Sequence, residues 1–166
     1  IAAGTVYAED YQHSEWDSWN AFGVGASSTM ETETAGTKMK MTTTLKKKEA
    51  DKLTVETVVE MMGTVMPPQE RTIAKPAAGV AKSADAKCPQ CGKAPHVKAT
   101  QKAEKLKVGD KEVDCTLIEA VVNGCDGKEM SVSKTWFSKA VPGGMVKLES
   151  KTGGMEVKQS CTTFEA

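Results

Sequence analysis

The stretch KLTVETVVEMM, residues 52–62, decides the fold class because apolar and polar side chains alternate along it. Successive side chains of a β-strand point to opposite faces of its sheet. The stretch therefore predicts one strand of an antiparallel sheet that is packed on one face and solvated on the other. The packed positions are Leu53, Val55, Thr57, Val59 and Met61, and the positions between them include Thr54, Glu56 and Glu60.

Similar stretches occur along most of the chain and are separated by turn-forming residues. They are SSTMETET, TKMKMTTTLKKK and ERTIAK in the first half, and AEKLKV, KEVDCTLIEAVV, KEMSVSKTWFS, MVKLESKT and MEVKQSCTTFE in the second. The pairs Gly109-Asp110 and Gly153-Gly154 are typical of two-residue hairpin turns. We expect a mainly β protein with about nine strands, in which residues 26–166 form a single antiparallel, strongly curved sheet or open barrel.

Residues 1–25 do not follow this pattern, and they predict a strand followed by one short N-terminal helix. Trp16, Trp19 and Phe22 recur at helical spacing, and Ser14 stands where an N-cap is needed. Gly23 ends the pattern. We expect the helix to close one end of the β core with its aromatic side chains.

Composition excludes two classes of partner. The 166 residues hold 22 Lys plus Arg and 22 Asp plus Glu, and Arg71 is the only arginine. A neutral chain with a single guanidinium group lacks the basic surface of a nucleic-acid reader. No apolar run approaches the ~20 residues needed to cross a bilayer. We therefore expect neither a nucleic-acid partner nor a membrane span.

The N-terminal segment predicts export. The chain begins with Ile1 rather than methionine, and Val6 and Ala8 form the small-x-small pattern of a signal-peptidase site before Glu9. We expect a periplasmic or extracellular location, and in such compartments cysteines commonly form disulfides.

The irregular segment 75–100 contains a Cys-x-x-Cys pair, Cys88 and Cys91, followed by His96. Three interpretations stay open. The pair forms a disulfide, internally or with Cys125; it binds zinc together with His96 and Cys125; or it is a redox dithiol. We favour the disulfide and no metal or other cofactor.

Sequence features argue against cofactor or redox chemistry at this pair. Gly92 stands where a haem-attachment motif requires histidine. A thiol oxidoreductase places its cysteines at the start of a helix, and Pro95 follows too closely for a long helix to begin there.

The remaining residues favour a protein that is not an enzyme. Cys115 and Cys161 fall on the inward positions of their stretches, so they either bridge strands or are buried thiols. His13 and His96 are the only histidines, and neither stands in a recognisable Ser-His-Asp or Cys-His arrangement. We also expect Trp136 to be buried, packed against Trp16 or Trp19.

Three stretches carry a family resemblance: WDSWNAFGVGAS at 16–27, VGDKEVDCTLIEA at 108–120 and KTWFSKAVPGGMVKLES at 134–150. The chain resembles a group of uncharacterised secreted bacterial β-rich proteins. They open with Trp-x-x-Phe-x-x-Gly and later carry Trp-x-Ser-x-x-Val-Pro-Gly-Gly-x-Val-Lys, here the structural motif of Trp136, Pro142, Gly143 and Gly144. Within this motif the Pro-Gly-Gly run predicts a tight turn, because Pro142 fixes φ and Gly143 adopts positive φ. The resemblance implies an export signal and a curved sheet loosely similar to bacterial lipoprotein-carrier sheets. It implies no catalytic residues.

These observations lead to one functional hypothesis and two alternatives. The hypothesis is an exported, non-enzymatic structural or assembly protein, a filament subunit joined to copies of itself through an N-terminal strand at Val6 and Tyr7. The first alternative is a periplasmic carrier that holds an apolar ligand in the concave sheet, where methionines such as Met39 and Met41 line the surface. The second, minor alternative is a dithiol oxidoreductase.

Overall fold

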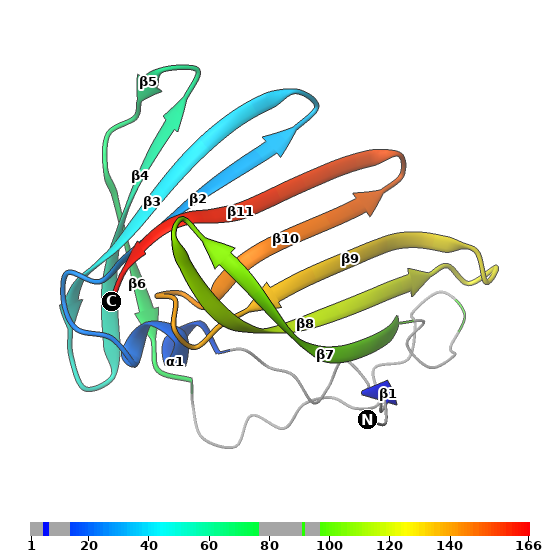
Figure 1. The fold of residues 1–166 in the computed structure, drawn as a ribbon, viewed down its shortest axis with the longest axis horizontal. Coiled ribbons are helices and arrows are strands. Elements are labelled where there is room, and N and C mark those ends of the chain that lie inside the picture. Colours follow the sequence, from blue (N-terminus) through cyan, green and yellow to red (C-terminus); the bar gives the residue numbers. More distant parts are fainter. Residues whose placement is uncertain (1–4, 7–13, 77–90, 92–96) are drawn as a thin grey trace.

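The computed structural model describes residues 5–6, 14–76, 91 and 97–166, and within them the chain forms one antiparallel sheet with one helix (Figure 1). The helix is α1 (Glu15–Asn20), and the strands are β1 (Thr5–Val6), β2 (Ser27–Thr34), β3 (Thr37–Lys48), β4 (Lys52–Met61), β5 (Thr64–Val65), β6 (Gln69–Ala74), β7 (Val97–Val108), β8 (Lys111–Asn123), β9 (Glu129–Phe137), β10 (Met145–Thr152) and β11 (Met155–Glu165).

The strands follow the order β1-β7-β8-β9-β10-β11-β2-β3-β4-β5, and β6 pairs with β4. The described sheet is strongly curved and not closed into a barrel, so the predicted fold class is confirmed. Most strands follow one another in sequence, but the pairing of β11 with β2 joins the two halves of the chain.

The described sheet has eleven strands, whereas the sequence predicts about nine in residues 26–166 and one in residues 1–25. The N-terminal strand is β1, and the additional strand is β5, whose two residues are too few to show an alternation. In addition, β7 begins at Val97, inside the segment expected to be irregular up to residue 100. It begins early because β8 extends to Asn123 and supplies backbone partners as far as Val97.

The helix is held at one end of the sheet by its two tryptophans, as the sequence predicts. Ser14 caps the helix and accepts a hydrogen bond from the Asp17 backbone N–H at 3.4 Å. Trp16 and Trp19 are 4% and 3% exposed, and they share a core cluster with Leu45, Leu53, Val55 and Ile73. A six-residue helix is not stable alone. Burial of each indole contributes about 4–6 kcal/mol to the free energy of folding before entropy costs. Packing of the two tryptophans therefore stabilises the helix.

The loop between β9 and β10 is tied to α1 through Gly143. Its φ of +80° is a conformation that favours glycine. A Cβ at this position would lie 3.0 Å from the Trp19 ring. The Gly143 backbone N–H donates to the Ser18 carbonyl at 3.2 Å, and the preceding Pro142 is fully buried. The Pro-Gly-Gly turn expected from the sequence thus also seats the helix.

Strand pairing places charged side chains on the face of the sheet opposite α1, which we call the charged face. One row crosses six neighbouring strands with alternating sign, in the order Glu119, Lys134, Glu149, Lys158, Glu33 and Lys38. Within the row, Lys134 Nζ lies 2.9 Å from Glu119 Oε1. Opposite charges on directly paired residues stabilise a sheet, and like charges destabilise it. The row therefore favours this pairing register over registers in which a strand is shifted by one residue.

Trp136 is buried, as expected, but its predicted partners are wrong. It is 6% exposed and belongs to a second core cluster with Cys115, Leu117 and Val146, whereas Trp16 and Trp19 belong to the first. The reason is strand alternation. Trp136 pairs with Leu117 and Lys147 on the charged face, and α1 lies on the other face.

The β7–β8 hairpin contributes to the surroundings of Trp136. The hairpin bends back over its neighbours, and its tip lies against β11 (Figure 1). Trp136 Nε1 donates to Glu104 Oε2 on β7 at 2.8 Å, which lowers the pKa of that carboxyl below its usual value. The Lys147 ammonium lies 4.8 Å from the centre of the indole ring, a cation–π contact.

Replacing Trp136 tests the importance of the second cluster. We expect Trp136→Ala to lower the free energy of unfolding by ~3–5 kcal/mol, the usual cost of removing a buried aromatic side chain. Trp136→Phe keeps a ring but loses the hydrogen bond to Glu104, so its cost should be smaller. Urea unfolding measures both. A loss below about 1 kcal/mol for the alanine variant would contradict a core role.

Candidate functional site

The face of the sheet that carries α1, here called the helix-side face, has two long cross-strand rows without any charged residue. The row nearer α1 contains Gln101, Ile118, Thr135, Leu148, Gln159, Thr32, Met39 and Met61. The next row contains Ala99, Ala120, Ser133, Ser150, Val157, Thr34 and Thr37. Apolar, hydroxyl and amide side chains therefore line a surface that spans most of the sheet.

The helix covers only one end of this face. Among the strands, α1 contacts chiefly β4 and β6, at the end where Leu53 and Ile73 are buried. Away from α1, the side chains of the two rows are half-buried or exposed, with Ala99 as the buried exception. In β4 itself, Leu53 and Val55 are fully buried, Val59 is half-buried and Met61 is 42% exposed. Burial thus declines along the strand with distance from the helix.

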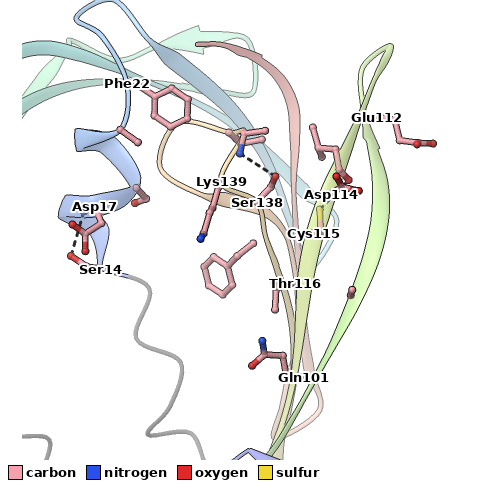
Figure 2. Close-up of a pocket in the computed structure, with 17 residues that line it drawn as sticks. Ser14, Asp17, Phe22, Gln101, Glu112, Asp114, Cys115, Thr116, Ser138 and Lys139 are labelled. Atoms are coloured by element: carbon pink, nitrogen blue, oxygen red, sulfur yellow. Dashed lines mark hydrogen bonds between the residues drawn. The ribbon is translucent and has the colours of Figure 1, made fainter. Parts of the chain in front are cut away.

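A pocket of about 1000 Å³ lies where the helix-side face meets α1 (Figure 2). Its floor includes Ala103, Thr116 and Phe137. These three residues form a further cross-strand row of the same face, one step closer to α1 than the row that contains Gln101 and Ile118. The walls come from α1, the β7–β8 hairpin and the start of the β9–β10 loop. The pocket and the uncharged rows therefore form one continuous surface.

Charged groups occur at the border of the pocket. Lys139 in the β9–β10 loop extends into the space between helix and sheet, Asp17 lies beside Ser14 at the start of α1, and Asp114 lies on β8 (Figure 2). Beside Lys139, the Ser138 hydroxyl accepts a hydrogen bond from the Ala140 backbone N–H at 3.3 Å. The site thus combines an uncharged surface with polar groups of both signs at the end next to α1.

One hydroxyl on the helix-side face has no partner among the described residues. Thr32 Oγ1 is buried without a hydrogen bond, between Gln159 and Met39 in the first row. An unsatisfied buried hydroxyl costs about 1–3 kcal/mol. A polar atom of a bound molecule at this level of the sheet would remove that cost.

The two buried cysteines are poor nucleophiles. Burial raises the pKa of the Cys115 thiol above its usual value and that of Cys161 to about 11. Both are 5% exposed, and they donate weakly to the carbonyls of Val113 and Thr163 respectively. The thiolate is the reactive form of cysteine, and a raised pKa reduces its population at neutral pH.

The structure describes only some of the residues that the sequence suggested for a disulfide, a metal site or assembly. Cys91 is half-buried in a turn, and Cys125 is exposed in the turn between β8 and β9. Cys88 and His96 lie outside the described residues, and so does Tyr7. No group of three His, Cys, Asp or Glu side chains in the described ranges is placed to hold a metal ion.

Val6 lies in β1 and pairs with Ala99 at the edge of the chain's own sheet. The motif residues Trp136, Pro142 and Gly144 are buried, and Gly143 contacts Trp19. No helix in the described part of the chain has the length and apolarity needed to cross a membrane.

Sequence reasoning missed the uncharged rows and the pocket. The alternation within each stretch was visible, but a row becomes apparent only when the register between strands is known. One signal was available: in the stretches around residues 37–48 and 52–62, charges fall on only one of the two alternating sets until the strand ends.

Comparison with known proteins gives a fold and no family. No family model matches the chain, and no curated protein matches it. A solved structure from Bacteroides fragilis, described as a candidate exported protein with a YmcC-like fold, covers 87% of this chain and 97% of its own at 8% identity, with a TM-score of 0.53. This likeness assigns the fold.

Two other solved structures are similar at a lower level. A lipoprotein candidate from Parabacteroides distasonis covers 86% of this chain and 96% of its own, at 10% identity and a TM-score of 0.49. The hypothetical lipoprotein YmcC from Escherichia coli covers 91% and 97%, at 14% identity and a TM-score of 0.37.

Alkylation tests the state of the buried thiols. At pH 8 we expect iodoacetamide to leave Cys115 and Cys161 unmodified in the folded protein, because their raised pKa values keep them protonated and burial blocks access. Both should react once the chain is unfolded in guanidinium chloride. Peptide mass spectrometry measures the labelling of each site. Equal labelling of Cys161 in folded and unfolded protein would contradict the structure.

Proposed function

We propose that this protein is an exported, non-enzymatic carrier that holds an apolar ligand on its helix-side face. The observation that carries the proposal is the separation of charge between the two faces of one sheet. The charged face presents alternating Lys and Glu to solvent, whereas the two rows on the helix-side face contain no charge over the same strands. A face that only met water would gain solubility from charged side chains.

The side chains of the site match a ligand with an apolar chain and a polar end. Met39, Met41, Leu148 and Ile118 offer apolar contacts, and methionine adapts to chains of different shape. The pocket beside α1 has Lys139 and Asp17 at its border, where a polar end would find partners. Ligand sites are typically largely apolar and concave with a few polar groups that orient the ligand.

Three observations support the absence of catalysis and the export of the protein. The buried thiols Cys115 and Cys161 have raised pKa values, opposite to what nucleophilic catalysis requires. The Bacteroides fragilis protein with the shared fold is described as an exported candidate. The Val6-x-Ala8 pattern is typical of a signal-peptidase site. A periplasmic or extracellular location follows from the proposal.

A matched pair of serine variants tests the ligand face. Ser150 lies in an uncharged row, and Ser160 lies on the charged face, where it pairs with Lys147 and Glu31. We expect Ser150→Lys to weaken binding of a fluorescent fatty-acid analogue at least about tenfold, because an ammonium placed against an apolar chain loses hydration. Ser160→Lys makes the same chemical change on the other face and should leave the affinity unchanged.

Fluorescence titration gives both affinities, and thermal unfolding checks that both variants fold. Equal affinities of the two variants, or no binding by the wild-type protein, would overturn the carrier proposal.

Self-assembly is a second candidate, and the position of β1 favours it. Thr5 and Val6 pair with Thr100 and Ala99 at one edge of the sheet, and β7 continues for eight residues beyond this pairing. An edge strand is a template for an extended segment. In the described chain β1 occupies that edge itself. Cleavage after Ala8 would remove β1, so this assembly applies to a chain that keeps residues 1–8. In such a chain, the same segment of a neighbouring molecule takes the place of β1 and joins subunits head to tail.

Deletion of residues 1–12 tests assembly. If a neighbour's segment joins the subunits, the full-length protein should form oligomers on size-exclusion chromatography and the deletion should yield monomers. Electron microscopy shows whether the oligomers are filaments. The same elution volume before and after deletion would exclude this mode of assembly.

A further inference from the structure

The hairpin turns farthest from α1 form one rim of the sheet (Figure 1). They join β2 to β3, β4 to β5, β8 to β9 and β10 to β11. This rim carries all the exposed large apolar side chains of the described residues except Val24: Met61, Met62, Val65, Met66, Met130 and Met155. Single exposed apolar side chains are common on protein surfaces, so it is their restriction to one edge of the sheet that indicates an interaction surface.

The exposed methionines form separate points along the rim. Met62 is 85% exposed at the β4–β5 turn, Met155 is 65% exposed beside the β10–β11 turn, and Met130 is 60% exposed beside the β8–β9 turn. A gap of about 300 Å³ lies between the β2–β3 and β10–β11 turns. A protein partner needs a contiguous, well-packed interface core. Binding to a lipid interface scales instead with the total apolar area that enters it, and separate side chains can each contribute to that area.

Charges near two of these turns are paired locally. Lys128 lies 3.9 Å from Asp126 at the β8–β9 turn, and Lys158 lies 3.2 Å from Glu156 on β11. Recognition of anionic lipids relies on clusters of Lys and Arg, and this rim alternates the two signs instead. Apolar contact with a zwitterionic lipid surface is the chemistry that the rim fits.

The rim also continues into the proposed ligand face. Met61 belongs both to the first uncharged row and to the rim, and Thr37 ends the second row at the β2–β3 turn. We infer that the rim docks on a lipid surface through Met62, Met130 and Met155. If the protein carries a ligand, the docked rim is also the edge where the ligand enters or leaves the helix-side face, and this second role rests on the proposed function. The docking on a lipid surface does not depend on it.

Flotation with phosphatidylcholine vesicles tests the docking. We expect the wild-type protein to float with the vesicles, and the partition to persist in about 0.5 M salt, which screens charge attraction. The triple variant Met62→Ser, Met130→Ser, Met155→Ser should lose about tenfold or more of the partition, because it removes apolar area from each point. Val24→Ser, at an apolar site away from the rim that is 62% exposed, should float like the wild-type protein.

Two results would overturn the inference. One is a wild-type protein that stays unbound or floats only with anionic vesicles at low salt, and the other is a triple variant that floats as well as the wild-type protein. The single variant Met62→Asp, at the most exposed position, repeats the test should the triple variant be unstable. Titration of the fatty-acid analogue without vesicles separates the two proposals. Retained binding by a protein that does not float contradicts the docking alone.

Discussion

Alternation of charge across the strands of one face is the constraint on which this structure depends. Lys134 stands between Glu119 and Glu149, and the same order continues through Lys158 and Glu33. A shift of one residue in any pairing would move charged side chains onto the helix-side face. Each exposed pair contributes little alone, about 0–1 kcal/mol. Among the described pairs of this row, Lys134 and Glu119 lie at ion-pair distance, 2.9 Å, and the alternation keeps like charges from facing each other across the other strands.

The second constraint is the attachment of α1 at one end of the sheet. Trp19 packs beside Gly143, and Trp16 and Trp19 cover Leu53 and Val55. Both core clusters draw on residues near this end, including Val141 of the β9–β10 loop. Side chains toward the opposite rim are less buried, and Met62 at that rim is the most exposed of the large apolar residues. The molecule therefore has a packed end, an uncharged face beside it and an apolar rim.

Local features were predictable because they depend on residues close in sequence. The stretch at 52–62 forms β4 almost to the residue, Ser14 caps α1, and Gly143 adopts the positive φ expected of its turn. Features that depend on strand order were not predictable. The pairing of β11 with β2 leaves no local signal, and without it the two halves of each uncharged row cannot be joined.

The error at Trp136 has the same origin. Its burial follows from its size and its alternating pattern, but its neighbours depend on which face of the sheet the helix covers. The pocket beside α1 is formed by the helix, the β7–β8 hairpin and the β9–β10 loop together, so no single stretch indicates it.

Methionine methyl resonances test the central claim, ligand binding on the helix-side face, most directly. Titration of methyl-labelled protein with a soluble fatty acid, without vesicles, should shift Met39 and Met41 in a saturable manner and leave Met130 in place. Unchanged Met39 and Met41 resonances, or shifts confined to the rim methionines, would contradict the account.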